Sequence, residues 1–252
     1  MNDEAEYRNV YERYLEYSGV SMGDARTYEN GALKGYYYWR QNYLKFLPAN
    51  KDARILELGC GWGMQMMAVK MLGYTNVVGV DVSGECVQIC KQHDLQAEQR
   101  DIASFLDACK EQYDVIFLHY VFEHMTRKEA LWVLGGIAAR LSAQGMLIIT
   151  VPNGWNLFGG ALRDADLTHE VSYTSHSLGQ VLRMSGYGDV VIFSTNMYAA
   201  YDKNIVARVL KTIFWGYSLL IELLIRAVML SFGLFEKEIR PNLVAVARLR
   251  KR

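Results

Sequence analysis

Eleven residues, R-I-L-E-L-G-C-G-W-G-M from Arg54 to Met64, constrain the fold of this chain more than any other stretch. Its first residues are apolar and predict a short buried strand. Three glycines then alternate with other residues at Gly59, Gly61 and Gly63, and glycine permits positive φ and close approach of a ligand to the backbone. Apolar residues at helical spacing continue to Gly73. We expect a strand, a tight turn and a helix whose first N–H groups can bind an anionic group.

The glycine spacing excludes two common phosphate-binding turns. A dinucleotide-binding turn has the pattern G-x-G-x-x-G, and its third glycine, counted from Gly59, falls on Met64. The chain also has no G-x-x-x-x-G-K segment. A nicotinamide-dependent dehydrogenase and a P-loop protein are therefore excluded, although the turn taken alone could still be purely structural.

An acidic residue ends the next predicted strand, N-V-V-G-V-D-V, which covers residues 76–82. Asp81 follows the glycines by about 20 residues, the separation at which a carboxylate can accept hydrogen bonds from the hydroxyls of a ribose. The alternative is that Asp81 caps the following helix, but Ser83 already suits that position. The ribose interpretation is favoured.

The E-x-G-x-G-x-G spacing, Asp81 and the R-D-I segment at 100–102 together resemble the motifs of class I S-adenosylmethionine-dependent methyltransferases of the type-11 and type-23 kind. The resemblance extends through residues 113–125 and 145–153, and it implies S-adenosyl-L-methionine as cofactor. It further implies that Asp101 meets the adenine amino group and that its apolar neighbour lies on the ring. The cofactor-binding residues that we assign on this basis are Glu57, Gly59, Cys60, Gly61, Gly63, Asp81, Val82, Asp101, Ile102 and His119.

Predicted strands and helices alternate from residue 54 to 153, which is typical of an α/β fold with a mostly parallel sheet and helices on both faces. We expect a Rossmann-like sheet of seven strands, with the last strand, 243–249, placed antiparallel between the fifth and sixth as the resemblance implies. Ligands of such sheets bind at the carboxyl ends of the strands. Glu57, Gly59, Asp81, Asp101, His119 and Asn153 all fall at such ends, which supports a single site.

The chain is long enough for one large domain. We expect a single methyltransferase domain over residues 1–252, and the resemblance implies that its aromatic N-terminal helices cap the cofactor and shape the substrate pocket. Most of those aromatic side chains should nevertheless pack the helices onto the sheet. The expected parts are cap helices at 1–50, a cofactor-binding core at 54–153, a substrate loop, helix and strand at 154–203, an apolar helical insertion at 204–236 and the last strand at 241–250.

The insertion at 204–235 is the least ordinary part of the sequence. Its polar residues recur at steps of three, four and seven and so share one helical stripe, and nearly all the others are apolar. Charges interrupt every apolar run well before the roughly 18 residues of a spanning helix. A helix lying in a membrane interface is favoured, with a homodimer seam or packing on the body as alternatives.

Composition narrows the partners and the compartment. Lys+Arg and Asp+Glu both number 27, and a nucleic-acid-binding domain usually has a basic excess. The four cysteines form no C-x-x-C pair, and the acidic start M-N-D-E-A-E does not fit a signal peptide. We expect a reduced, cytoplasmic protein without a nucleic-acid partner, peripheral on the inner face of the membrane if the insertion binds lipid.

Methyl transfer from a sulfonium depends mainly on orientation, and a hydroxyl acceptor also benefits from a general base. We favour His169, in the D-L-T-H-E segment at 166–170, because its position resembles that of a substrate-facing histidine in many methyltransferases. His124 is the second candidate, and the absence of a dedicated base is a third possibility. The expected substrate-binding residues are Asp166, Glu170, Asn153 and Trp155.

Glu123, His124, Asp166 and His169 could together hold a metal ion. The chain has no short H-x-x-x-H or H-x-H pair among them, so we expect no metal site.

These patterns lead to one preferred function and two alternatives. We expect an S-adenosylmethionine-dependent methyltransferase (EC 2.1.1.-) that O-methylates a sugar, a glycan or a lipid-linked small molecule. One alternative is a soluble dimeric O- or N-methyltransferase of natural products. The other is a catalytically inactive scaffold protein that keeps the fold.

Overall fold

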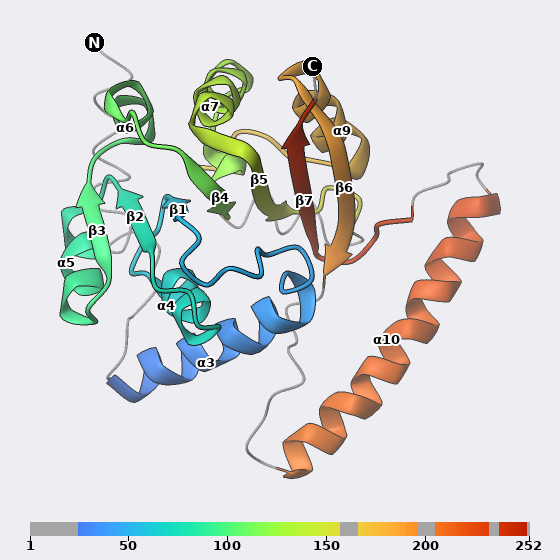
Figure 1. Ribbon diagram of the computed structural model, residues 1–252. Coiled ribbons are helices and arrows are strands. Elements are labelled where there is room, and N and C mark those ends of the chain that lie inside the picture. The colour runs from blue at the N-terminus through green and yellow to red at the C-terminus, as the bar shows by residue number, and fades with distance from the viewer. Residues whose placement is uncertain (1–24, 157–165, 196–204, 232–236, 251–252) are drawn as a thin grey trace.

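The computed structural model describes residues 25–156, 166–195, 205–231 and 237–250. They form one seven-stranded sheet with strand order β3-β2-β1-β4-β5-β7-β6, and helices cover both of its faces (Figure 1). Strand β7 runs antiparallel to both of its neighbours, β5 and β6, while the other pairings are parallel. The predicted fold class and the place of the last strand are confirmed.

The strands are β1 (Ile55–Leu58), β2 (Val77–Asp81), β3 (Gln96–Gln99), β4 (Tyr113–His119), β5 (Leu141–Pro152), β6 (Tyr187–Thr195) and β7 (Asn242–Leu249). The helices are α3 (Ala25–Asn42), α4 (Met64–Met71), α5 (Gly84–Gln92), α6 (Ile102–Ala108), the short 3-10 helix η1 (Phe122–His124), α7 (Arg127–Arg140), α9 (Ser175–Met184) and α10 (Ile205–Ser231). The predicted cap helix before residue 25 lies outside the described residues.

Capping residues explain where several helices begin. The hydroxyl of Ser83 accepts a hydrogen bond from the Cys86 N–H at 3.3 Å, so Ser83 caps α5 as expected. Thr126 and Glu129 form the predicted capping box of α7, in which each side chain accepts from the other residue's backbone N–H. These bonds satisfy N–H groups that the first turn of a helix leaves without partners.

The sheet separates two apolar cores. On one face, α6, α7 and α9 pack against β1, β4 and β5. On the other face, α3 and α4 bring aromatic and apolar side chains against the same strands. Tyr38 and Trp39 of α3 and Tyr43, which directly follows the helix, are all buried, and the Tyr43 hydroxyl lies 2.8 Å from Thr150 Oγ1 of β5. The prediction that these aromatic residues fasten the N-terminal helix to the sheet is confirmed.

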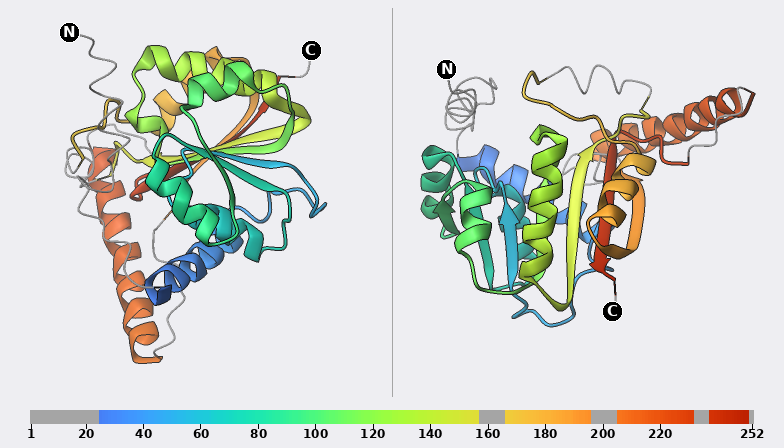
Figure 2. Two further views of the ribbon diagram at one scale, coloured as in Figure 1. Left: turned by 90° about the vertical axis from the view of Figure 1, so that its left-hand side faces the viewer. Right: turned by 90° about the horizontal axis from the view of Figure 1, so that it is seen from above.

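Helix α10 projects from the β6 edge of the sheet and extends away from the body (Figures 1 and 2). Two of its charged residues face the chain that leads into β7: Glu222, which pairs with Arg226 at 2.9 Å, also lies 3.3 Å from Arg240, and Arg226 donates to the Lys237 carbonyl. Its large apolar side chains are instead at least half exposed at Val209, Ile213, Tyr217, Leu220, Ile221, Leu223, Leu224, Val228 and Leu230. Packing of this face into the body is therefore not what the described residues show. None of the described helices is long and apolar enough to cross a membrane.

Candidate active site

The glycine turn after β1 is held against the end of β2. The N–H groups of Gly59 and Cys60 both donate to the carbonyl of Val80, at 2.8 and 3.0 Å. Gly59, Gly61 and Gly63 have φ of 73°, 48° and 81°, the left-handed region in which other residues are strained. The sequence places glycine at each position that this turn requires.

Gly61 differs from its two neighbours in having open space beside it. A Cβ on Gly59 would lie 2.4 Å from Val121 Cγ2, and one on Gly63 would lie 2.4 Å from Leu95 Cδ1. A Cβ on Gly61 would meet no described atom within 4 Å. The turn is therefore packed at both ends and open in the middle, where a ligand can approach the backbone.

Asp81 lies directly beside this open position. Its Oδ2 accepts a hydrogen bond from the Gly61 N–H at 2.7 Å, and its Oδ1 accepts from the Ser83 N–H at 2.9 Å. Burial raises the pKa of Asp81, and the two backbone donors oppose that shift. Ser83 supplies the helix cap, so the role of Asp81 as ribose ligand stays a prediction.

Two groups that sequence reasoning missed complete the turn. Cys90 Sγ lies 3.3 Å from the Gly61 carbonyl oxygen, and the Tyr28 hydroxyl donates to the Trp62 carbonyl at 3.3 Å. Tyr28 also stacks on the half-buried His93, with ring centroids 3.5 Å apart. Tyr28 lies 34 residues before Trp62 in the chain, so the sequence alone does not predict this contact.

The remaining expected cofactor residues lie along the same edge. Glu57 is buried within β1, and burial raises its pKa well above the ordinary value. Asp101 caps α6 by accepting from the Ser104 N–H at 2.8 Å, and Ile102 is the first residue of that helix. Val82 follows β2 directly. Their contact with a cofactor stays a prediction.

His119 ends β4 among three tyrosine rings, with centroids 6.1 Å from Tyr38, 6.5 Å from Tyr43 and 4.7 Å from Tyr120. Burial lowers the pKa of His119 to about 3. The unfolded chain, in which a histidine titrates near 6.5, therefore takes up a proton first as the pH falls. Stability that is present above about pH 6.5 is lost on acidification towards pH 3.

We expect His119→Gln to reduce this acid sensitivity. By pH 5 the titration of His119 should cost the wild type about 1–2 kcal/mol, a value that allows for the partial exposure of the ring. The variant should lack this loss while every other titrating group still contributes. Urea unfolding of both proteins at pH 7 and pH 5 measures the difference, and equal losses would contradict the assignment.

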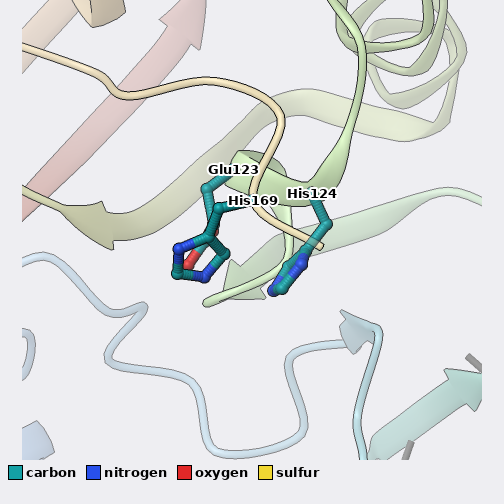
Figure 3. A group of neighbouring side chains, drawn as sticks. All are labelled: Glu123, His124 and His169. Carbon is teal, nitrogen blue, oxygen red and sulfur yellow. The ribbon is translucent and has the colours of Figure 1, made fainter. Parts of the chain in front are cut away.

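A second group of side chains gathers at the end of β4. Glu123 and His124 come from η1, and His169 comes from the segment that follows β5 (Figure 3). The backbone N–H groups of Glu170 and Val171 donate to the Glu123 carbonyl at 2.9 and 3.0 Å. These two bonds bring His169 within 4.7 Å of His124, measured between ring centroids.

The segment around Thr168 orients His124. The Thr168 hydroxyl donates to Asp166 Oδ1 at 2.6 Å, and His124 Nδ1 lies 2.8 Å from the same hydroxyl oxygen. Burial, aided by the nearby His169, lowers the pKa of His124 to about 4. Burial also raises the pKa of Glu123 to about 8. The group thus combines a neutral imidazole with a carboxyl that favours its protonated form at neutral pH.

The other expected substrate residues divide by exposure. Glu170 is exposed, while Asp166 and Trp155 are half-buried. Asn153 is only 1% exposed, and its Nδ2 donates to the carbonyls of Glu238 and Arg240 at 2.7 and 2.8 Å. We assign Asn153 a structural role in place of the expected contact with substrate, because both of its donors are used within the fold.

The chain is similar to proteins of one known family. Residues 32–190 match the family described as "Methyltransferase domain", which is more than half of the chain. The chain belongs to this family. Its membership confirms the predicted relation to class I S-adenosylmethionine-dependent methyltransferases and, at the level of the family, the predicted cofactor.

Curated relatives of this methyltransferase-family chain are distant. A ubiquinone biosynthesis O-methyltransferase of Xanthomonas campestris pv. campestris is 28% identical over 120 residues, which are 45% of this chain and 49% of the relative. An uncharacterized RNA methyltransferase of Leptospira interrogans is 27% identical over 46% of this chain and 26% of its own length. The chain spans about half of the length of the first relative and less of the second.

Solved structures show the same fold over nearly the whole chain. An S-adenosylmethionine-dependent methyltransferase from Archaeoglobus fulgidus has a TM-score of 0.63 at 19% identity, covering 96% of this chain and 99% of its own. A methyltransferase from Haloferax volcanii, solved with the activator Trm112, has the same TM-score at 15% identity, with 96% and 98% covered. At such identities the likeness concerns the fold alone.

Proposed function

We propose that this chain transfers a methyl group from S-adenosylmethionine to an oxygen nucleophile. The observation that carries the proposal is that two groups of side chains lie at the carboxyl ends of neighbouring parallel strands, at one edge of the sheet. Asp81 and the open Gly61 form the first, and His124 and His169 belong to the second. Val121 joins them, since its side chain closes on Gly59 while it immediately precedes η1.

In this proposal Asp81 accepts hydrogen bonds from the ribose hydroxyls of the cofactor, and the glycine turn receives its amino-acid part. The acceptor oxygen attacks the methyl carbon in line with the sulfur. The O–C bond forms as the C–S bond breaks, S-adenosylhomocysteine leaves, and His169 takes the hydroxyl proton. His169 is preferred to His124 because the lowered pKa of His124 makes that imidazole a weak base.

An amphiphilic acceptor, such as a lipid-linked sugar or another lipid-linked small molecule, is supported by α10. At 100° per residue, its exposed apolar side chains fall within about half of the helix circumference, opposite Glu222 and Arg226. A face of that width suits a helix lying in a membrane interface. The O-methyltransferase name of one relative supports oxygen as the nucleophile. Our proposal includes a peripheral location at the cytoplasmic face of a membrane.

The test follows labelled methyl groups from S-adenosylmethionine into an extract of the cells that naturally make the protein, separated into lipid and aqueous phases. We expect label in the lipid phase. The double variant Leu220→Glu/Leu224→Glu, which charges the exposed face of α10, should lower lipid labelling at least tenfold while leaving binding of S-adenosylhomocysteine unchanged. Met184→Glu, at an apolar residue of α9 that is 68% exposed, is the matched control.

Other outcomes separate the alternatives. Label in the aqueous phase, with a stable dimer by light scattering, would favour the soluble dimeric enzyme of natural-product metabolism. Cofactor binding without label in either phase would favour the inactive scaffold. An RNA acceptor has less support because the net charge is zero.

A further inference from the structure

We propose that Glu123, His124 and His169 bind one divalent transition-metal ion. Each side chain offers one ligand atom, and the three atoms all lie within 4.8 Å of one another (Figure 3). Two imidazole nitrogens and one carboxylate oxygen form a ligand set that proteins use for zinc and for other first-row divalent metals. Three protein ligands leave at least one position for a further oxygen.

The geometry needs only a small adjustment to close around an ion. Metal–ligand distances of about 2.0–2.2 Å place neighbouring ligand atoms about 3–4 Å apart. His124 and His169 are both half-buried, so neither ring is enclosed on every side. The backbone bonds from Glu170 and Val171 to the Glu123 carbonyl already hold the two segments together.

Glu123 supplies a second, independent observation. Its side chain is 2% exposed, and neither carboxylate oxygen has a hydrogen-bond partner among the described residues. A buried carboxylate without hydrogen bonds is unfavourable unless a cation or a proton compensates it. Two imidazoles lie at the same place, so a metal ion satisfies the carboxylate and uses the neighbouring nitrogens together.

The surroundings of His124 fit a metal ligand. Since the Thr168 hydroxyl gives its hydrogen to Asp166, its oxygen is left to accept from His124 Nδ1–H. The proton of the neutral imidazole then resides on Nδ1 and the lone pair on Nε2. A metal-ligating histidine usually donates its other ring N–H to a carboxylate, a backbone carbonyl or water, and His124 Nδ1 also lies 3.3 Å from the Thr168 carbonyl oxygen.

The catalytic consequence rests on the proposed function, whereas the binding does not. An acceptor hydroxyl at the open position would have its pKa lowered by the ion. Its proton would leave to solvent as the methyl group is transferred, and His169 would serve as a ligand in the loaded protein. His169 as base and His169 as ligand thus describe the metal-free and metal-loaded forms of one site.

The test uses the full chain, stripped of metal with a chelator and then titrated with zinc chloride and cobalt chloride. We expect saturable binding of one ion per chain by calorimetry and by elemental analysis. Glu123→Gln and His169→Ala should each weaken binding by about 100-fold or more, beyond the 10–100-fold typical of changes in the second layer. His176→Ala, which removes an exposed histidine from the first turn of α9, should leave it unchanged.

Three results would overturn the proposal: the absence of saturable binding, binding that both site variants retain, or a thiolate-to-cobalt charge-transfer band that assigns the ion to a cysteine. If Glu123→Gln does not fold, His169→Ala carries the test because its side chain is half-buried. Titration with S-adenosylhomocysteine is run in parallel on the stripped protein. Loss of cofactor binding there would contradict the proposed function, whereas loss of metal binding alone would contradict only this inference.

Discussion

Replacing Asp81 with alanine should weaken the binding of S-adenosylhomocysteine by about 100-fold or more. A carboxylate that accepts from two ribose hydroxyls contributes roughly 1.5–3 kcal/mol per hydrogen bond, and about 1.4 kcal/mol corresponds to a factor of ten. The carboxylate already accepts from the N–H groups of Gly61 and Ser83. The cofactor must therefore share or replace these bonds, which keeps the expected effect near the lower end of that range.

Calorimetric titration measures the effect, and thermal unfolding must accompany it because the substitution also removes an acceptor from two backbone donors. Asp81→Asn keeps the shape of the side chain and should fall between the wild type and Asp81→Ala. Asp52→Ala is the matched control, since Asp52 is an exposed acid just before β1, at the opposite edge of the sheet. Wild-type affinity in a folded Asp81→Ala protein would refute the ribose assignment.

His169→Ala should lower kcat by about 10²–10⁴-fold, the usual contribution of a positioned general base. The affinity for S-adenosylhomocysteine should not change, because His169 belongs to the acceptor side of the proposed site. Steady-state rates measure the loss of kcat, and calorimetric titration measures the affinity for S-adenosylhomocysteine.

Two controls make this experiment specific. His176→Ala removes a histidine of α9 outside the site and should retain full turnover. Rates with and without chelator separate the two forms of the site: a loss confined to the metal-loaded enzyme assigns His169 to the ion rather than to the proton. Full turnover of His169→Ala in both forms at every pH would exclude both roles.

Much of the fold could be predicted because it depends on local patterns. The glycine turn, the capping box at Thr126 and the alternation of strands and helices are written in short stretches of sequence, and the structure has them at the predicted places. The position of β7 came from the resemblance, because strand order is set by pairing between distant segments. Because ligands of such sheets bind at the carboxyl ends of the strands, the predicted strand ends identified the edge of the sheet at which the candidate residues lie.

Details that depend on contacts between distant segments could not be predicted. The side chain of Asn153 falls at a strand end, as a substrate ligand would, but its hydrogen bonds to the carbonyls of Glu238 and Arg240 need the chain near β7 to return there. Likewise, spacing along the chain does not show whether Glu123, His124 and His169 meet. The approach of His169 to Glu123 and His124 depends on backbone bonds across two segments.

The orientation of α10 also depends on contacts between distant segments. A helical stripe of charged residues predicts an amphipathic helix, but not which side faces the protein. Here Glu222 and Arg226 face the body and the apolar side faces outward, because Arg240 offers a partner for the carboxylate. A sequence pattern gives the two faces of a helix, and only the neighbouring segments decide which face is covered.

The short segment before β7 connects α10 to the residue that follows β5. Arg240 binds Glu222 through its guanidinium, while its carbonyl accepts from the Asn153 amide. Arg226 of α10 also donates to the Lys237 carbonyl in the same segment. A shift of α10 would therefore be transmitted to Asn153, the residue after β5, at the edge of the sheet where the candidate site lies.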